Sequence, residues 1–176
     1  MASNSSDSAK VPPITLRTHR PGDMGWVVER HGTLYRQEYG WDERFEALVA
    51  RIVADFIDQL EPERERCWIA ERDGQRLGCV FLVRDRDQPA DAPPSAKLRL
   101  LLVDPAARGL GLGAALVHEV TLYARNTGYR KISLWTNNVL DSARRIYQQE
   151  GYQLTREEPY TAFGKELVSQ DWELLL

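Results

Sequence analysis

Two periodicities of apolar residues divide the chain into helices and strands. In residues 45–60 the apolar side chains recur at i, i+3, i+4 and i+7, which predicts an amphipathic helix stopped by Pro62. Residues 67–87 contain two alternating apolar runs around an Asp-Gly pair at 73–74, the pattern of a β-hairpin. Residues 96–105 are almost continuously apolar, which indicates a strand buried on both faces in the middle of a sheet.

The other segments extend this alternation. Similar patterns predict strands over 14–19, 131–136, 152–158 and 167–175, and helices over 24–38, 111–127 and 141–151. The unit 97–136 is strand, helix, strand, so we expect two parallel strands joined by a right-handed crossover. Because the hairpin is antiparallel, the predicted fold class is α/β with a mixed α+β sheet in one domain. Asp23 and Asp141 are expected to cap the helices that follow them.

Composition narrows the class of protein. The 176 residues are 43% hydrophobic and 28% charged with a net charge of −3, so no global basic field argues for nucleic acid. Cys67 and Cys79 lie in apolar segments without a metal-ligand spacing, which favours reduced core cysteines, no metal and a cytoplasmic location. No apolar run approaches membrane-spanning length. We expect residues 1–12 to be a disordered leader and residues 13–176 to be the folded domain.

The stretch "RGLGLG" at 108–113 places three glycines between a predicted strand and a predicted helix. Glycines at a helix N-terminus let a phosphate approach unpaired backbone N–H groups. A P-loop is excluded because no Lys-Ser/Thr pair follows. A dinucleotide fingerprint is formally matched, but the acidic residue expected about 20 residues later is missing. A tight turn without a ligand would need one glycine only.

A third loop pattern, [QR]xxGx[GA], is matched by Arg108, Gly111 and Gly113. With this loop, the preceding "VDP" and the later "ARRIYQQEGY", the sequence from 14 to 176 resembles the GNAT N-acetyltransferase family. It is also similar to the acetyltransferase half of bacterial MarR–GNAT fusion proteins. The resemblance implies a central mixed sheet of about seven strands flanked by about four helices.

The resemblance also implies acetyl-CoA as co-substrate and assigns residues to it. The backbone of the loop would hold the pyrophosphate, and the strand before it would pair with the pantetheine arm. The family often has an Asn seven residues before its Tyr; that position is Leu140 here, and Asn137 or Asn138 could take its place. The implied cofactor-binding residues are Leu101, Leu102, Val103, Arg108, Gly109, Leu110, Gly111, Leu112, Gly113, Asn137 and Asn138.

Tyr147 occupies the position at which the family places a general acid. A phenol with a pKa of about 10 is protonated at neutral pH and can donate to the CoA thiolate; the alternative is a packed core aromatic. A backbone N–H in the strand at 101–103 is the implied oxyanion donor. The proton acceptor is not identified: carboxylates near "YGWDE" or a water chain could serve. His31 and His118 are expected to be packed or solvated.

The acceptor is expected to be a primary amine of a small molecule or a peptide, with Glu38, Trp41 and Trp135 as candidate substrate-binding residues. A non-catalytic acyl-CoA sensor or interaction domain would keep the glycine loop without needing Tyr147, and a nicotinamide-binding protein is the third alternative. No nucleic-acid or membrane partner is indicated. The apolar segment 172–176 could complete the sheet or meet a partner, which leaves a homodimer open.

Overall fold

The computed structural model describes residues 12–89 and 91–176, and the predicted order of strands and helices is confirmed. The leader expected over residues 1–12 lies outside the described part of the chain except for Pro12. The bounds are β1 Thr15–Thr18, α1 Asp23–Tyr39, α2 Glu43–Gln59, β2 Arg66–Arg72, β3 Gln75–Arg84, β4 Ser95–Val103, a 3-10 turn Pro105–Ala107, α3 Leu112–Asn126, β5 Lys131–Asn137, α4 Asp141–Glu150, β6 Gln153–Ala162 and β7 Lys165–Leu175.

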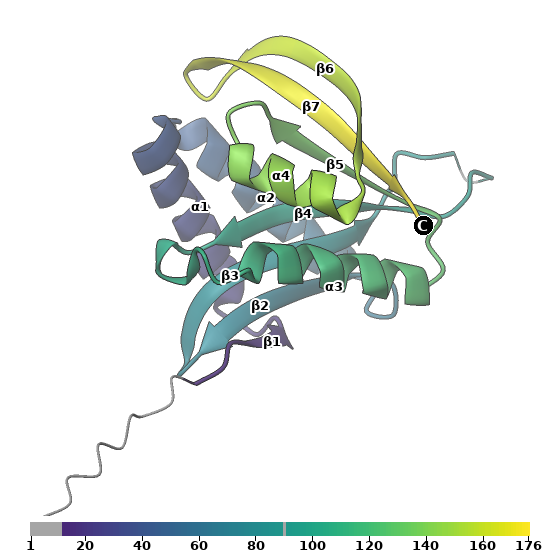
Figure 1. The fold of residues 1–176 in the computed structure, drawn as a ribbon, viewed down its shortest axis with the longest axis horizontal. Coiled ribbons are helices and arrows are strands. Elements are labelled where there is room, and N and C mark those ends of the chain that lie inside the picture. Colours follow the sequence, from purple (N-terminus) through teal and green to yellow (C-terminus); the bar gives the residue numbers. More distant parts are fainter. Residues whose placement is uncertain (1–11, 90) are drawn as a thin grey trace, which may run out of the picture.

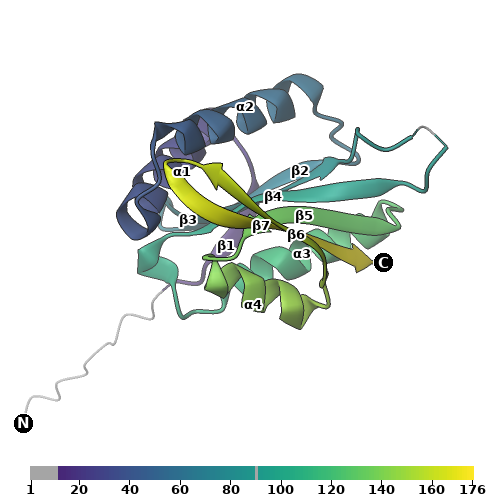
Figure 2. The same ribbon diagram turned by 90° about the horizontal axis from the view of Figure 1, so that it is seen from above.

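The seven strands form one mixed sheet in the order β1-β2-β3-β4-β5-β7-β6. Strands β4 and β5 are parallel, as the strand–helix–strand unit predicted, and the other neighbours within the described residues are antiparallel. Helices α1 and α2 cover one face of the sheet and α3 and α4 the other, as Figure 2 shows. The last residues complete β7, which pairs with β5 on one side and β6 on the other (Figure 1).

Each face of the sheet carries its own apolar core. Leu116 and Val120 of α3 pack with Ile132 of β5 on one face. On the other face Val49 and Phe56 of α2 pack against β3. Both cysteines are buried in this second core and are free thiols, as expected.

Both predicted helix caps, Asp23 and Asp141, are wrong. Gly22, with φ 93°, is the N-cap of α1, and Asp23 is its first residue. The Asp23 carboxylate instead accepts bonds from Arg17, Arg76 and the Arg20 backbone N–H. Burial alone would raise the pKa of Asp23, but these bonds, that of Arg17 foremost, lower it to about 2. The Asp23 carboxylate therefore ties β1 and β3 to the start of α1 rather than capping it.

Asp141 likewise begins α4 without capping it. The N-cap of α4 is Leu140, no side chain closes the helix end, and Asp141 bonds to Arg144 one turn later. Its negative charge still lies in the first turn, where the helix dipole favours it. Within the described residues no helix is long and apolar enough to cross a membrane.

Candidate active site

The glycine loop and the start of α3 form one wall of a cavity of about 430 Å³. Gly111, with φ 74°, is the N-cap of α3, and no side chain caps the helix. The backbone N–H groups of Leu112, Gly113 and Ala114 donate to no described residue. Since the first N–H groups of a helix need partners from outside it, this end of the cavity is suited to an anion such as a phosphate.

The three glycines have two different roles. Gly109 and Gly111 have φ of 76° and 74°, a backbone conformation that side chains disfavour, and an added Cβ would meet nothing within 4 Å at either position. At Gly113 an added Cβ would lie 2.7 Å from Cδ1 of Ile146. The first two glycines therefore shape an open loop, whereas the third allows α3 to approach α4.

The sheet opens next to this loop. The β4–β5 ladder pairs Ser95–Lys97 with Lys131–Ser133 and does not continue beyond them. From Leu98 to Val103 the edge of β4 that faces β5 therefore has no neighbouring strand among the described residues, and an extended chain could add there as a strand. By the family resemblance, β4 is the strand with which the pantetheine arm would pair.

A β-bulge lies in β4 at the same place. The β3–β4 register shifts between Cys79 and Phe81, and Leu100 has φ 53°. The Cys79 thiol donates to the Leu100 carbonyl at 3.3 Å. As a result both Leu100 and Leu102 pack on the α1/α2 face, and Leu101 turns to the α3/α4 face. Bulges redirect side chains and leave backbone groups unpaired, here beside the opening.

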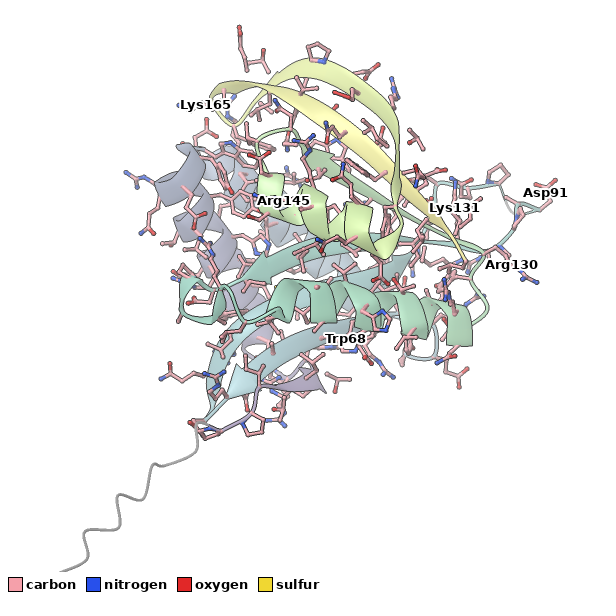
Figure 3. The ribbon with its side chains drawn as sticks, in the orientation of Figure 1. Trp68, Asp91, Arg130, Lys131, Arg145 and Lys165 are labelled. Carbon is pink, nitrogen blue, oxygen red and sulfur yellow. The ribbon has the colours of Figure 1, made fainter. Side chains whose placement is uncertain are left out.

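A larger cavity of about 810 Å³ lies between the α1/α2 pair and the strands β4 to β7. Its helical wall is aromatic and aliphatic, and its strand wall carries most of the charged groups. The tip of the β6–β7 hairpin packs against this helical side: the ring centroids of Phe163 and Trp41 lie 4.9 Å apart at a tilt of 31°, and Lys165 marks this tip in Figure 3. The two cavities share four lining residues, Tyr35, Leu101, Leu140 and Ala143.

Tyr147 lines the larger cavity close to this junction. Its side chain is 5% exposed, and its hydroxyl makes no hydrogen bond to a described residue. Burial raises the pKa of Tyr147 above its ordinary value, so the phenol stays protonated at neutral pH. Tyr35 belongs to the same environment: burial raises its pKa first, and the nearby Tyr147 raises it further. Sequence reasoning missed Tyr35, whose position in the middle of a helix carries no motif.

Comparison with known proteins decides the family. Residues 26–152, well over half of the chain, match the profile of the acetyltransferase (GNAT) family. The chain belongs to the GNAT acetyltransferase family. The further resemblance to MarR-fused acetyltransferases stays a prediction.

The relatives of this GNAT protein differ in length, and the chain spans less than half of the first one. It is 33% identical over 144 residues to mycothiol acetyltransferase of Sanguibacter keddieii, covering 80% of this chain and 44% of the relative. It is 31% identical over 126 residues to an uncharacterized N-acetyltransferase of Schizosaccharomyces pombe, covering 72% and 73%. A Salmonella typhimurium acetyltransferase structure, solved with its cofactor acetyl-CoA, superposes with TM-score 0.72 at 18% identity, covering 93% and 94%.

The smaller cavity fits the co-substrate of the GNAT family, acetyl-CoA. Uncapped N–H groups at the start of α3 suit its pyrophosphate, and the open space over Gly109 and Gly111 leaves the approach free. The free edge of β4 suits its amide-containing arm. Of the loop residues expected to bind it, Arg108, Gly109, Gly111, Leu112 and Gly113 line the cavity, as do all three expected β4 residues. Leu110 does not line it and is 57% exposed.

The two candidate asparagines are separated by the structure. Asn137 is buried, lines the larger cavity and accepts a bond of 2.7 Å from the Tyr160 hydroxyl. Asn138 lines neither cavity, and its Oδ1 accepts the backbone N–H of Val168. Leu140, the position at which the family often has Asn, lies at the junction itself.

The residues expected to bind the acceptor lie at two different cavities. Trp41, 3% exposed, and Trp135, 45% exposed, both line the larger cavity. Glu38 lies instead at the smaller cavity, where it bonds to Nη2 of Arg108 at 2.6 Å. Asp42 caps α2 through the Arg44 N–H and lines neither cavity. The structure thus places Glu38 on the side of the co-substrate.

His31 is packed, as expected of a lone helical histidine, but it also lines the larger cavity. Its Nδ1 lies 2.8 Å from the Val27 carbonyl, which only accepts, so Nδ1 carries the proton. Burial lowers the pKa of His31 to about 4, and the ring is neutral at physiological pH. His118 is exposed on α3, near Glu150.

Proposed function

We propose that this chain transfers an acetyl group directly from acetyl-CoA to a primary amine of a small molecule or a peptide. The observation that carries the proposal is the junction of the two cavities. A phosphate-binding loop and a free strand edge lead to it from one side, and a large mixed-polarity cavity leads to it from the other. Two reactants that enter by separate cavities can meet there without a covalent enzyme intermediate.

Acetyl-CoA supplies an acetyl thioester when bound, and the residues of this chain position it and handle protons. The N–H groups at the start of α3 hold the pyrophosphate, and the backbone of β4 orients the arm. An N–H of the bulged segment 101–103 stabilises the developing oxyanion. Asn137, whose Oδ1 already accepts a bond from Tyr160, contributes to the wall of the larger cavity rather than to binding of the pantetheine arm.

Tyr147 is the general acid that protonates the departing thiolate at its Oη. Three features support this role: the hydroxyl has no described partner, the residue lies beside the junction, and burial keeps the proton on the oxygen. The amine attacks the thioester carbonyl in its neutral form: the C–N bond forms, the C–S bond breaks, and Tyr147 gives its proton to the thiolate. The nitrogen gives up its proton to water in the open cavity, and Tyr147 regains a proton from the same water, because the ring of His31 is buried.

The second candidate function is a non-catalytic acyl-CoA-binding sensor or interaction domain. It explains the loop but leaves the larger cavity and the buried Tyr147 hydroxyl without a role. The size of that cavity, about 810 Å³, therefore favours the enzyme.

The testing experiment combines calorimetric titration with acetyl-CoA and a thiol-release assay on a panel of amines. We expect acetyl-CoA to bind, and free thiol to appear only with acetyl-CoA and an amine together. Binding without thiol release on any amine would support the sensor. Absence of binding would remove both functions.

A further inference from the structure

The charged groups of the larger cavity reveal what kind of acceptor it fits. Among the described residues the cavity is lined by three permanent cations, Lys97, Arg99 and Arg156, and by four carboxylates, Asp85, Asp87, Asp171 and Glu173. A charged side chain that already forms an ion pair inside the protein attracts a ligand only weakly. The side chains that indicate the charge of the ligand are therefore those without an ion-pair partner.

Most of these charges are paired. Lys97 bonds to Asp85 at 3.1 Å and also to Asp87. Arg156 bonds to Glu158 on its own strand. Glu173 accepts from Lys131 at 2.7 Å.

Two groups of opposite sign are left. Within residues 12–89 and 91–176, the side chains of Arg99 and Asp171 make no hydrogen bond or ion pair, and they do not pair with each other. The guanidinium of Arg99 interacts electrostatically with the carboxylate of Asp87: the bond from Lys97 lowers the pKa of Asp87, and the charge of Arg99 lowers it slightly more. The Asp87 carboxylate is already bound by Lys97, however, so the N–H donors of the Arg99 guanidinium remain available to another acceptor.

Arg99 lies near the junction of the two cavities along β4. It immediately precedes Leu100, the residue of the bulge, and stands two residues before Leu101, which lines both cavities. Asp171 lies on β7 between Trp135 of β5 and Arg156 of β6; the bond to Glu158 is the main cause that raises the pKa of Arg156, and the charge of Asp171 raises it further without a hydrogen bond. A planar guanidinium with free donors is the group that binds carboxylates in a two-pronged fashion.

The opposite wall is apolar. Helix α2 lines the cavity with Phe45, Leu48, Val49 and Ile52, and Trp41 adds to this wall from the connection between α1 and α2. An occupant that matches both walls has one negative group, one positive group and an apolar side chain.

We propose, building on the acetyltransferase function above, that the acceptor is a zwitterion of the α-amino-acid type with an apolar side chain. Its carboxylate binds Arg99, its ammonium form is attracted by Asp171 before the proton is lost, and its side chain packs on the α1/α2 wall. Arg99 is then the residue that determines specificity between amino acids and amines without a carboxylate.

The experiment compares leucine, methionine and phenylalanine with their carboxamides, which keep the amine and lose the carboxylate. We expect the wild type to favour the acids in kcat/KM, and Arg99→Met to lose about 10- to 100-fold on the acids while leaving the carboxamides unchanged. Arg156→Met is the matched control, since Arg156 lines the same cavity and is already paired with Glu158. Because Arg156 lies opposite Asp171, this variant can change KM only for acids and carboxamides alike, since both carry the ammonium group. It should preserve the preference. Asp171→Asn should raise KM for acids and carboxamides alike, because both carry the ammonium group.

A second readout separates this inference from the proposed function. Calorimetric titration of the CoA-loaded protein with N-acetyl-phenylalanine measures recognition of the carboxylate without turnover. Binding that Arg99→Met loses would support the acceptor class even if no amine were acetylated. Equal use of acids and carboxamides by the wild type, or no binding of the acetylated acid, would overturn it while thiol release from other amines still upheld the acetyltransferase.

Discussion

The two cavities meet at Tyr35 and Leu101, but they are shaped by different kinds of groups, one mainly by backbone and the other by side chains. The smaller one is formed largely by main chain: the positive-φ glycines, the uncapped start of α3 and the unpaired edge of β4. The larger one is formed by side chains from seven helices and strands and from the loops between them, and its character depends on which charges are paired. The first should therefore fail when atoms are added to the backbone, and the second when side-chain groups are removed.

The largest expected effect belongs to the junction. Tyr147→Phe should lower kcat by about 100- to 10,000-fold, because the thiolate loses its proton donor. Affinity for acetyl-CoA should change little, since the hydroxyl does not line the smaller cavity. Steady-state kinetics with calorimetry measures both.

Tyr152→Phe is the control for this change. The Tyr152 ring lies 5.8 Å from the Tyr147 ring and is buried on the same core, but it lines neither cavity. Its removal of one hydroxyl should leave kcat unchanged. Turnover of Tyr147→Phe equal to that of the wild type would make Tyr147 a core aromatic only.

The next effect tests the backbone-built cavity. Gly111→Glu should weaken acetyl-CoA binding by about 100-fold or more, because it adds a carboxylate where the helix N-terminus attracts phosphate. Gly74→Glu is a matched control: Gly74 also has φ 74° and open space around it, but lies in the β2–β3 turn. Both variants carry the same backbone strain, so an equal loss of binding in both would assign the effect to unfolding rather than to phosphate repulsion.

Gly78 extends the same comparison to a distant part of the chain. An added Cβ at Gly78 would lie 2.8 Å from the Leu102 carbonyl, on the strand that lines the smaller cavity. Gly78→Ala should cost about 1–3 kcal/mol of unfolding free energy and weaken acetyl-CoA binding, because β4 must move. Gly25→Ala, where nothing lies within 4 Å of the new Cβ, should be neutral or stabilising in the same denaturant titration.

These differences explain which parts of the molecule could be predicted from sequence. A backbone that needs positive φ or close approach requires glycine, and a glycine pattern is visible in the sequence; the loop at 108–113 and the hairpin at 73–74 were predictable for that reason. The order of strands and helices along the chain followed from periodicity, and the parallel pair β4 and β5 from the crossover rule; the place of β7 between β5 and β6 was not predicted.

What could not be predicted depends on pairing in space. The bulge at Leu100 is hidden in a run of leucines, since one extra residue leaves no mark on a continuously apolar segment. Asp23 and Asp141 had the sequence context of caps, but Asp23 bonds to Arg17 and Arg76 from two strands, and Asp141 bonds to Arg144 one turn later in its own helix. That Arg99 has no ion-pair partner among the described residues can be seen only in the structure, which shows that the neighbouring cations Lys97 and Arg156 bind the nearby carboxylates.

The smallest expected effect decides to which cavity Glu38 belongs. Its ion pair with Arg108 is partly exposed, and such pairs contribute about 0–1 kcal/mol. Glu38→Gln removes a negative charge beside the phosphate-binding loop and frees Arg108, so acetyl-CoA affinity should rise by up to about 5-fold at low salt and less at high salt. The KM of the amine should stay the same. A rise in that KM of about 10-fold with unchanged acetyl-CoA affinity would instead place Glu38 with the acceptor, and would show that the boundary between the two cavities lies nearer the loop than Tyr35 and Leu101 indicate.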